Sequence, residues 1–283
     1  MYPHKIVFGL TLYDLLICVG IIACFFSFSY LADRSRIKNK LQSYSMIVGV
    51  MAIALGFGSA ILFQALYNVE STGKFEIVTN TGATFYGGLI GGVTVFLVLY
   101  FGFGGLVFKT DALKGYHKNN FFNIARCGAP SIVVAHAFGR IGCLTAGCCH
   151  GAPTDSWLGI LMYGDMGYRK YVPVQLFEAI FLFALFALLF MRARDGKRYN
   201  LSVYVMVYGV WRFVVEYLRR DYRGSISFTS LTPSQFIAVL MVLAGVGLIF
   251  LERYICNRIE RNAEQAAESA AESAVVKEDR DEA

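Results

Sequence analysis

Long apolar stretches alternate with short polar links along most of this chain. Seven stretches are long enough to cross a hydrocarbon core of about 30 Å, which takes about 20 helical residues. They cover 8–31, 45–67, 83–104, 121–144, 172–191, 201–218 and 233–251. Backbone groups in lipid must be hydrogen-bonded within their own segment, so each stretch is expected to be helical. The pattern predicts an all-α polytopic membrane protein with about seven transmembrane helices.

Composition agrees with a membrane location. Of the 283 residues, 56% are hydrophobic and only 16% are charged, whereas soluble domains carry about 25% charged residues. The basic residues stand in short clusters between apolar stretches, so nucleic acid is not expected as a partner. The first stretch is longer than the core of a signal peptide, and its positive charges follow it, so we interpret it as a retained span.

The basic links predict the orientation of the chain. Links at 33–40, 109–118 and 192–198 are rich in Lys and Arg, as is the segment after the last stretch. Because cytoplasmic loops carry the excess of positive charge, the N-terminus is predicted outside and the C-terminus in the cytoplasm. Arg219, Arg220 and Arg223 break this rule. They are either tolerated charges or an error in topology, or they serve a function, which is the interpretation we favour.

The last part of the chain differs in composition from the rest. Residues 257–283 contain AAESAAES and end in KEDRDEA, with no apolar face long enough for a core. We therefore expect two regions: a seven-helix membrane domain at 1–256 and a polar cytoplasmic tail at 257–283. The tail is expected to be disordered or a frayed helix.

Polar side chains within the spans gather toward one leaflet when each is placed by the direction of its helix. The outer ends hold Asp14, Tyr86, His136, Arg140, Gln175, Glu178, Arg212, Glu216, Arg219 and Gln235. The inner half holds almost none apart from end residues such as Arg126. Ionisable residues at membrane depth are costly and are functional candidates by default. Asp14 is the exception, because a helix-start role suffices to explain it.

Spacing within this group suggests shared helix faces. His136 and Arg140 are four apart, as are Arg212 and Glu216, so each pair lies on one face. Guanidinium groups bind phosphate bidentately and stay charged in a low-dielectric site, which suits an anionic lipid headgroup. Structural alternatives remain open: an ion pair between helices for Arg212 and Glu216, and a satisfied core histidine for His136. For Glu178 the alternative is a hydrogen bond to a neighbouring helix end.

Five segments, in order along the chain, resemble the prolipoprotein diacylglyceryl transferase family. They are IVFGLTLYDLL at 6–16, FYGGLIGG at 85–92, HAFGRIGCLTAGCCHG at 136–151, VPVQLFEAI at 172–180 and RFVVEYLRRD at 212–221. The sequence also departs from the family pattern: Tyr86 stands in place of a histidine, Cys143 and Ala146 in place of asparagines, and Cys148 in place of a glutamate.

The resemblance implies seven transmembrane helices in a bacterial cytoplasmic membrane and a site open to the outer leaflet. The implied reaction moves diacylglyceryl from phosphatidylglycerol, a membrane lipid, to the lipobox cysteine in the signal peptide of a prolipoprotein. It forms a thioether and releases glycerol phosphate, and no metal or soluble cofactor is implied. The expected catalytic residues are Tyr86, His136, Arg140, Arg212 and Glu216, with His136 as base. Expected substrate-binding residues are Gly87, Gly88, Gly139, Arg140, Gln175, Glu178 and Arg219.

A cysteine cluster, Cys143, Cys148 and Cys149, leaves other functions open. It is interpreted first as small residues filling a glycine-rich turn, then as one disulfide from Cys143, and last as a metal site, because its spacing is not a standard zinc pattern. The alternative functions are a membrane thiol-redox or metal-handling protein built on these cysteines, or a non-catalytic lipid-binding relative. Transport is disfavoured, since no internal repeat is visible.

Overall fold

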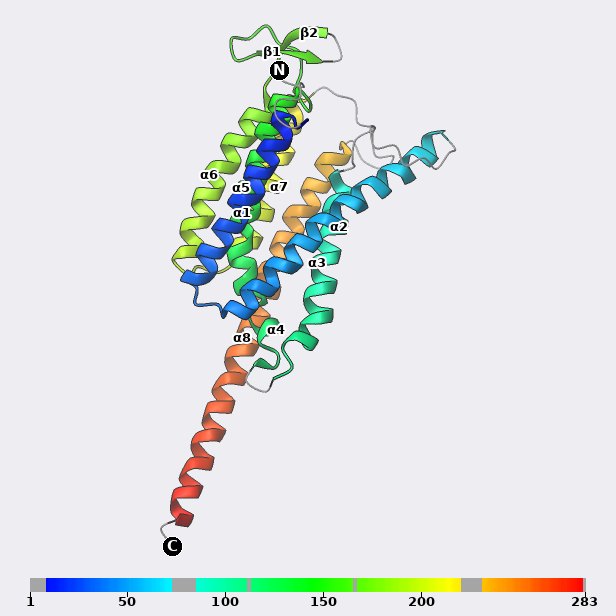
Figure 1. Ribbon diagram of the computed structural model, residues 1–283. Coiled ribbons are helices and arrows are strands. Elements are labelled where there is room, and N and C mark those ends of the chain that lie inside the picture. The colour runs from blue at the N-terminus through cyan, green and yellow to red at the C-terminus, as the bar shows by residue number, and fades with distance from the viewer. Residues whose placement is uncertain (1–8, 73–84, 111–112, 165–166, 220–230, 282–283) are drawn as a thin grey trace. The chain divides into compact units, whose positions relative to one another are not determined.

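The computed structural model describes residues 9–72, 85–110, 113–164, 167–219 and 231–281 (Figure 1). Its helices are α1 (Leu12–Arg34), α2 (Asn39–Thr72), α3 (Phe85–Val107), α4 (Tyr116–Asn119), α5 (Phe121–Ala146), α6 (Val174–Arg194), α7 (Asn200–Val215) and α8 (Pro233–Asp281). Within these residues, seven helices are long and apolar enough to cross a membrane, α4 being too short. The predicted all-α architecture with seven spans is confirmed.

A short antiparallel hairpin, which was not expected, follows α5. It is formed by β1 (Ile160–Gly164) and β2 (Gly167–Tyr171), with Ile160 paired to Tyr171. Helix α8 continues as one helix to Asp281, through the region expected to be disordered or a frayed helix. The division into a membrane domain and a tail remains a prediction.

The chain divides into two compact units. The first contains residues 1–31 and 125–283, and the second residues 32–124. The core of the first unit is made by α5, α6 and α7. Its buried members are Val133, Ala137, Leu182, Leu185, Leu189 and Tyr208. These positions recur at spacings of three and four, so each helix directs one apolar face to the others.

An interior proline in α5 is compensated by a neighbouring helix. Pro130 has no N–H to donate to the carbonyl four residues earlier, which belongs to Arg126. The side-chain amide of Asn200, at the start of α7, reaches that carbonyl oxygen at 3.4 Å and also donates to the carbonyl of Leu189 at 3.1 Å. Asn200 therefore joins α5, α6 and α7 at the end of the unit away from the hairpin.

Close helix contact marks the second unit, where α2 packs on α3. A Cβ on Gly56 would lie 3.0 Å from the Cα of Gly92, and such contact between backbones requires glycine. Gly87 faces Phe63, and Gly88 faces Ala60. The two glycines predicted to bind substrate therefore pack against α2 here.

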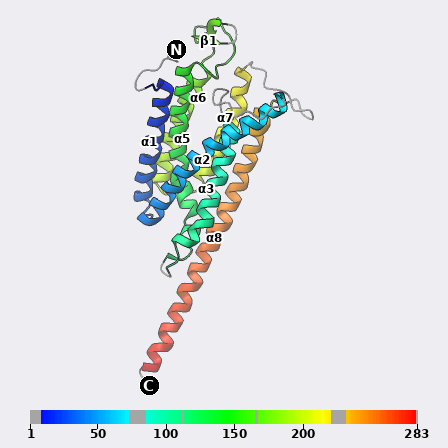
Figure 2. The same ribbon diagram turned by 45° about the vertical axis from the view of Figure 1, so that its right-hand side comes forward.

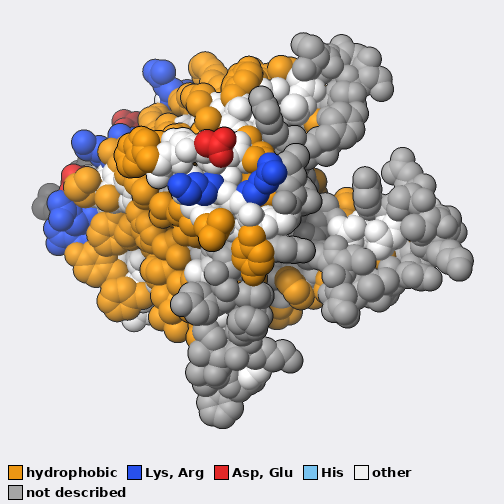
Figure 3. Space-filling model, turned by 90° about the horizontal axis from the view of Figure 1, so that it is seen from above, with side chains coloured by type: hydrophobic (Ala, Val, Ile, Leu, Met, Phe, Trp, Pro, Cys, Tyr) orange, Lys and Arg blue, Asp and Glu red, His pale blue; other side chains and the backbone are white. Residues whose placement is uncertain are grey.

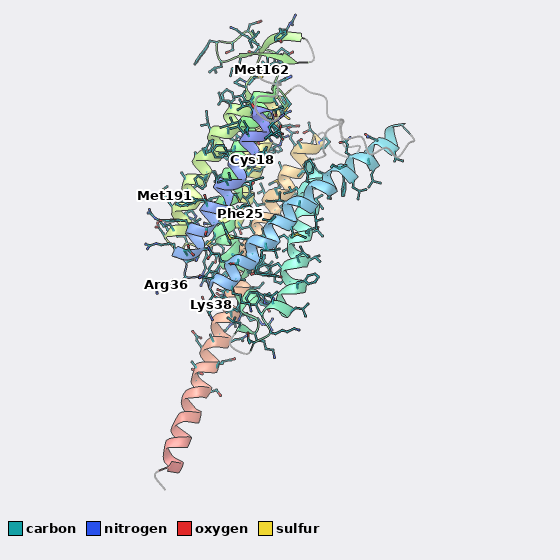
Figure 4. All side chains as sticks on the ribbon, in the orientation of Figure 1. Cys18, Phe25, Arg36, Lys38, Met162 and Met191 are labelled. Atoms are coloured by element: carbon teal, nitrogen blue, oxygen red, sulfur yellow. The ribbon has the colours of Figure 1, made fainter. Side chains whose placement is uncertain are left out.

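The hairpin lies at the end of the first unit where α5 ends and α6 begins (Figure 1 and, turned by 45°, Figure 2). Met162 of β1 is fully buried there, whereas Met191 lies near the opposite end of α6 (Figure 4). The hairpin region also exposes Trp157, Leu161 and Tyr168. Figure 3, viewed onto this end, shows an acidic side chain and basic ones together amid apolar side chains, with further basic side chains toward one edge.

Candidate active site

The predicted polar residues of α5, α6, α7 and α8 meet at the hairpin end of the first unit. Helices α5 and α7 end there, and α6 and α8 begin there. A residue in the last turns of α5 or α7 is therefore level with one in the first turn of α6 or α8. This alternation explains how positions far apart in sequence share one site.

Arg140 and Glu178 form the centre of the cluster. Nη2 of Arg140 lies 2.9 Å from Oε1 of Glu178, whose side chain is fully buried. The hydroxyl of Tyr208, on α7, donates to the same carboxylate oxygen at 2.7 Å. Isolated buried carboxylates are strongly disfavoured, so these two partners are what permit a charge at this position.

His136 extends the cluster along α5. Its Nδ1 is 3.3 Å from the hydroxyl of Tyr204, and its Nε2 is 4.0 Å from Oε1 of Glu178. The ring also packs edge-on against Tyr208, with a centroid separation of 4.9 Å. The imidazole is thus held by three neighbours beside the Arg140–Glu178 pair.

A second pair of charged residues begins one helical turn after Tyr208 on α7. Nη2 of Arg212 is 3.1 Å from Oε2 of Glu216, an ion pair by distance whose angles are not those of a hydrogen bond. The same nitrogen donates to Oγ of Ser234 at 3.2 Å, and Thr232 donates to Oε1 of Glu216 at 3.2 Å. Residues at the start of α8 therefore complete this pair.

Several buried polar atoms of the cluster have no hydrogen-bond partner among the residues that the structure describes. Two are donors, Nε of Arg140 and Nη1 of Arg212. Two are acceptors, Oε1 of Gln175 and Oε2 of Glu178. An unsatisfied buried group costs about 1–3 kcal/mol, so these atoms mark a place for a ligand or ordered water. The set suits a phosphate ester that carries hydroxyl groups.

The loop after α5 borders this site. Gln175 is fully buried and donates from Nε2 to the carbonyl of Cys148 at 2.6 Å. Hydrogen bonds with the Cys143 and Cys148 thiols lower the pKa of Cys149, and the positive charges of Arg140 and Arg219 act in the same direction. Arg219 is itself buried, and its effect on Cys149 places it at the border of the site.

The remaining predicted residues belong to the second unit, face α1 or fall outside the described side chains. Gly87 and Gly88 belong to the second unit, and the side chain of Tyr86 is not among those described. Gly139 faces Ile17 of α1, 3.7 Å from where a Cβ would stand. Asp14 accepts hydrogen bonds from the backbone and hydroxyl of Thr11, which confirms its helix-start role.

Four members of the cluster were not predicted: Tyr204, Tyr208, Thr232 and Ser234. The tyrosines precede Arg212 at intervals of four, and this i, i+4 stripe along α7 was a usable signal. The tyrosines carry no charge, so a pattern of ionisable residues does not include them. Thr232 and Ser234 gave no comparable pattern.

Comparison with known proteins identifies the family of this chain. Residues 4–251 match the model of the prolipoprotein diacylglyceryl transferase family. A phosphatidylglycerol–prolipoprotein diacylglyceryl transferase 2 from Clostridium perfringens is 32% identical over 249 residues, covering 85% of this chain and 91% of the relative. The corresponding transferase of Clostridium tetani is 29% identical, over 87% and 96%. That of Staphylococcus aureus is 30% identical, over 85% and 84%. This chain therefore belongs to the prolipoprotein diacylglyceryl transferase family.

Proposed function

We propose that this chain transfers the diacylglyceryl group of phosphatidylglycerol to the thiol of a lipobox cysteine in a prolipoprotein. The observation that carries the proposal is the pair of buried arginine donors, Arg140 Nε and Arg212 Nη1, which have no partner among the described residues. Both belong to guanidinium groups held in place by carboxylates. Fixed, positively charged donors in a dry site are what a phosphate leaving group requires.

The lipid headgroup accounts for the acceptors as well. The phosphate binds Arg140 and Arg212, and hydroxyls of the terminal glycerol donate to Oε1 of Gln175 and Oε2 of Glu178. Negative charge on the bridging oxygen grows as the ester breaks, so both arginines bind the transition state more strongly than the ground state. Arg219 adds positive charge at the border of the site.

The reaction is a substitution at carbon. Sulfur of the acceptor attacks the glyceryl carbon that bears the phosphate ester, and the C–S bond forms as the C–O bond breaks. The electron pair leaves on the phosphate oxygen, which gives glycerol phosphate and a thioether. A thiol has an ordinary pKa of about 8.5, so only modest help is needed to remove its proton. His136, held by Tyr204 and next to Glu178, takes that proton.

The protein is a multi-pass membrane protein, and its relatives are bacterial. We place it in the cytoplasmic membrane with the hairpin end facing outward. The basic links at 33–40, 109–118 and 192–198 support this orientation. The exposed Trp157 and Tyr168 fit a hairpin that lies at a membrane–water interface, because aromatic side chains favour both interfaces of a bilayer.

The direct test uses the purified full-length protein in mixed micelles with a lipobox peptide. With phosphatidylglycerol, we expect mass spectrometry to find one diacylglyceryl group on the cysteine and glycerol phosphate in solution. A matched peptide with serine in place of the cysteine should stay unmodified. If folded protein binds the lipid and leaves the cysteine peptide unchanged, the chain is a lipid-binding relative, and the proposal fails.

A further inference from the structure

Three cysteine thiols converge at the border of the site. Cys143 lies in the last turn of α5, and Cys148 and Cys149 follow it in the loop. Their Sγ atoms all lie within 4.8 Å of one another, and all three thiols are free. The transfer mechanism described above uses none of them, so their convergence requires a separate explanation.

The end of α5 brings the first two thiols together. Gly147 has a φ of 79°, its N–H donates to the carbonyl of Leu144 at 3.2 Å, and the N–H of Cys148 donates to the carbonyl of Cys143 at 3.2 Å. This is the Schellman pattern, in which the side chains flanking the two ends of the turn meet. Five-residue spacing between Cys143 and Cys148 therefore produces contact, although it is not a standard metal-binding spacing.

The third thiol and the loop are held in place as well. Cys149 has a φ of 61°, a left-handed conformation that is unfavourable for a residue with a side chain. Gln175 fixes the preceding carbonyl from α6 at 2.6 Å. The neighbouring His150 lies outside the cluster: its ring packs against Tyr171 at a tilt of 38°, with a centroid distance of 4.1 Å.

The cluster fits a thiophilic metal ion. Tetrahedral zinc has Zn–S bonds of about 2.3 Å, which place two sulfur ligands about 3.8 Å apart. The thiols need therefore close by at most about 1 Å, which side-chain rotation supplies. Three protein ligands and one open position are the pattern of catalytic rather than structural zinc sites. In the described residues, no histidine, cysteine or carboxylate completes the group as a fourth ligand.

We propose that Cys143, Cys148 and Cys149 hold a zinc ion whose open position binds the acceptor thiol and activates it for transfer. The inference rests on the proposed function and names its nucleophile-activating site. Zinc makes a bound thiol lose its proton, and His136 takes that proton up. The zinc-bound sulfur then donates an electron pair to the glyceryl carbon, and the carbon–oxygen pair leaves with the phosphate. The resulting neutral thioether is a weak zinc ligand and dissociates.

The neighbouring charges suit both partners of this reaction. Arg140 lies one helical turn before Cys143, on the same side of α5. Arg140 and Arg219 are also close enough to Cys149 to act on it electrostatically. Three thiolates around zinc carry one net negative charge, which these guanidinium groups offset. The same arginine, Arg140, thus places the lipid phosphate next to the acceptor sulfur.

Metal content is the first test. Full-length protein in detergent, kept reduced and dialysed against zinc, should bind about one zinc per chain by elemental analysis. Cys143→Ser, Cys148→Ser and Cys149→Ser should each lose that zinc while keeping the wild-type circular dichroism. Cys18→Ser and Cys256→Ser are the matched controls and should retain it; Cys18 lies on α1, outside the cluster (Figure 4). Wild type that binds no zinc, or cluster variants that keep it, would overturn the proposal.

The open position is tested with cobalt(II) in place of zinc. Absorption bands of the cobalt protein should change when the lipobox peptide is added and stay unchanged with the serine peptide. An identical response to both peptides means a closed structural site and overturns the role in activation.

The two proposals fail in different ways. If protein stripped of zinc by a chelator transfers at the wild-type rate, the zinc proposal is contradicted and the proposed transferase activity stands. If the bound metal coordinates the cysteine peptide but no transfer from phosphatidylglycerol occurs, the transferase proposal is contradicted and the zinc–thiol site stands.

Discussion

Arg140 of α5 and Glu178 of α6 face each other with 2.9 Å between Nη2 and Oε1. The pair is completed by Tyr208 of α7, which donates to the same oxygen at 2.7 Å. Side chains from α5 and α7 thus meet at one carboxylate oxygen of α6, and Nε of Arg140 and Oε2 of Glu178 are left without a hydrogen-bond partner among the described residues. In the proposed function, this pair positions the arginine for a lipid phosphate.

Glu178→Gln tests this positioning. The amide keeps the shape and accepts a hydrogen bond but loses the charge, and hydrogen bonds to charged groups contribute about 1.5–3 kcal/mol. We expect kcat/KM for transfer to fall about ten- to a hundredfold. Glu252→Gln is the control, a buried glutamate that accepts from the backbone of Tyr199 at 3.0 Å. Equal losses in both variants would show a general packing effect instead.

Arg212→Lys separates charge from geometry. Lysine keeps the positive charge but cannot contact Ser234, Glu216 and a phosphate oxygen through a planar fork. The KM for phosphatidylglycerol should rise about tenfold or more, in an assay that varies the lipid fraction of the micelle. Arg126→Lys, whose arginine donates to the carbonyl of Gly196 at 3.1 Å at the other end of α5, should leave that KM near the wild-type value.

His136→Gln tests the proposed proton acceptor. Glutamine can still contact Tyr204 but cannot take a proton, so kcat near neutral pH should fall. A free acceptor thiol ionises by itself with a pKa of about 8.5, and the rate of the variant should therefore recover as the pH rises toward that value. A loss of equal size at every pH would assign His136 a purely structural role.

Gly151→Ala tests how the loop after α5 is held. A Cβ there would lie 2.8 Å from the carbonyl oxygen of Leu218 and 2.7 Å from Cγ2 of Val174, and overpacking of this kind costs about 1–3 kcal/mol. The thermal unfolding midpoint in detergent and the transfer rate should both drop. Gly128→Ala, in α5 with open space around it, should preserve both, and a similar drop there would contradict this account.

The spans could be predicted from hydropathy, because lipid imposes the same requirement on every segment that crosses it. Their ends could not. Helix α2 begins at Asn39 rather than near 45 and runs to Thr72, since a helix in water beyond the membrane has no hydropathy signal. The hairpin at 160–171 was missed for a related reason: its strands are five residues each, too short for an alternating pattern to be distinct.

At the site, the charged residues could be predicted from the sequence better than the neutral polar residues. His136 and Arg140 meet Glu178, and Arg212 meets Glu216, at the end of the unit where their helix directions place them. Tyrosine, serine and threonine hydroxyls are common on membrane helices and have many roles. Whether one belongs to the site depends on its tertiary contacts, which the sequence does not show.

Convergence of the three thiols also depended on geometry beyond sequence spacing. Their meeting requires the helix cap at Gly147 and the left-handed Cys149, and the spacing of the cysteines gave no sign of either.

The most direct test of the account compares wild type with Arg140→Gln in the peptide assay. Wild type should add one diacylglyceryl group to the lipobox cysteine and release an equal amount of glycerol phosphate. Folded Arg140→Gln should lose at least about a hundredfold in kcat/KM, since it removes a charged donor from the leaving group. Transfer by Arg140→Gln at the wild-type rate would contradict the assignment of this cluster as the active site.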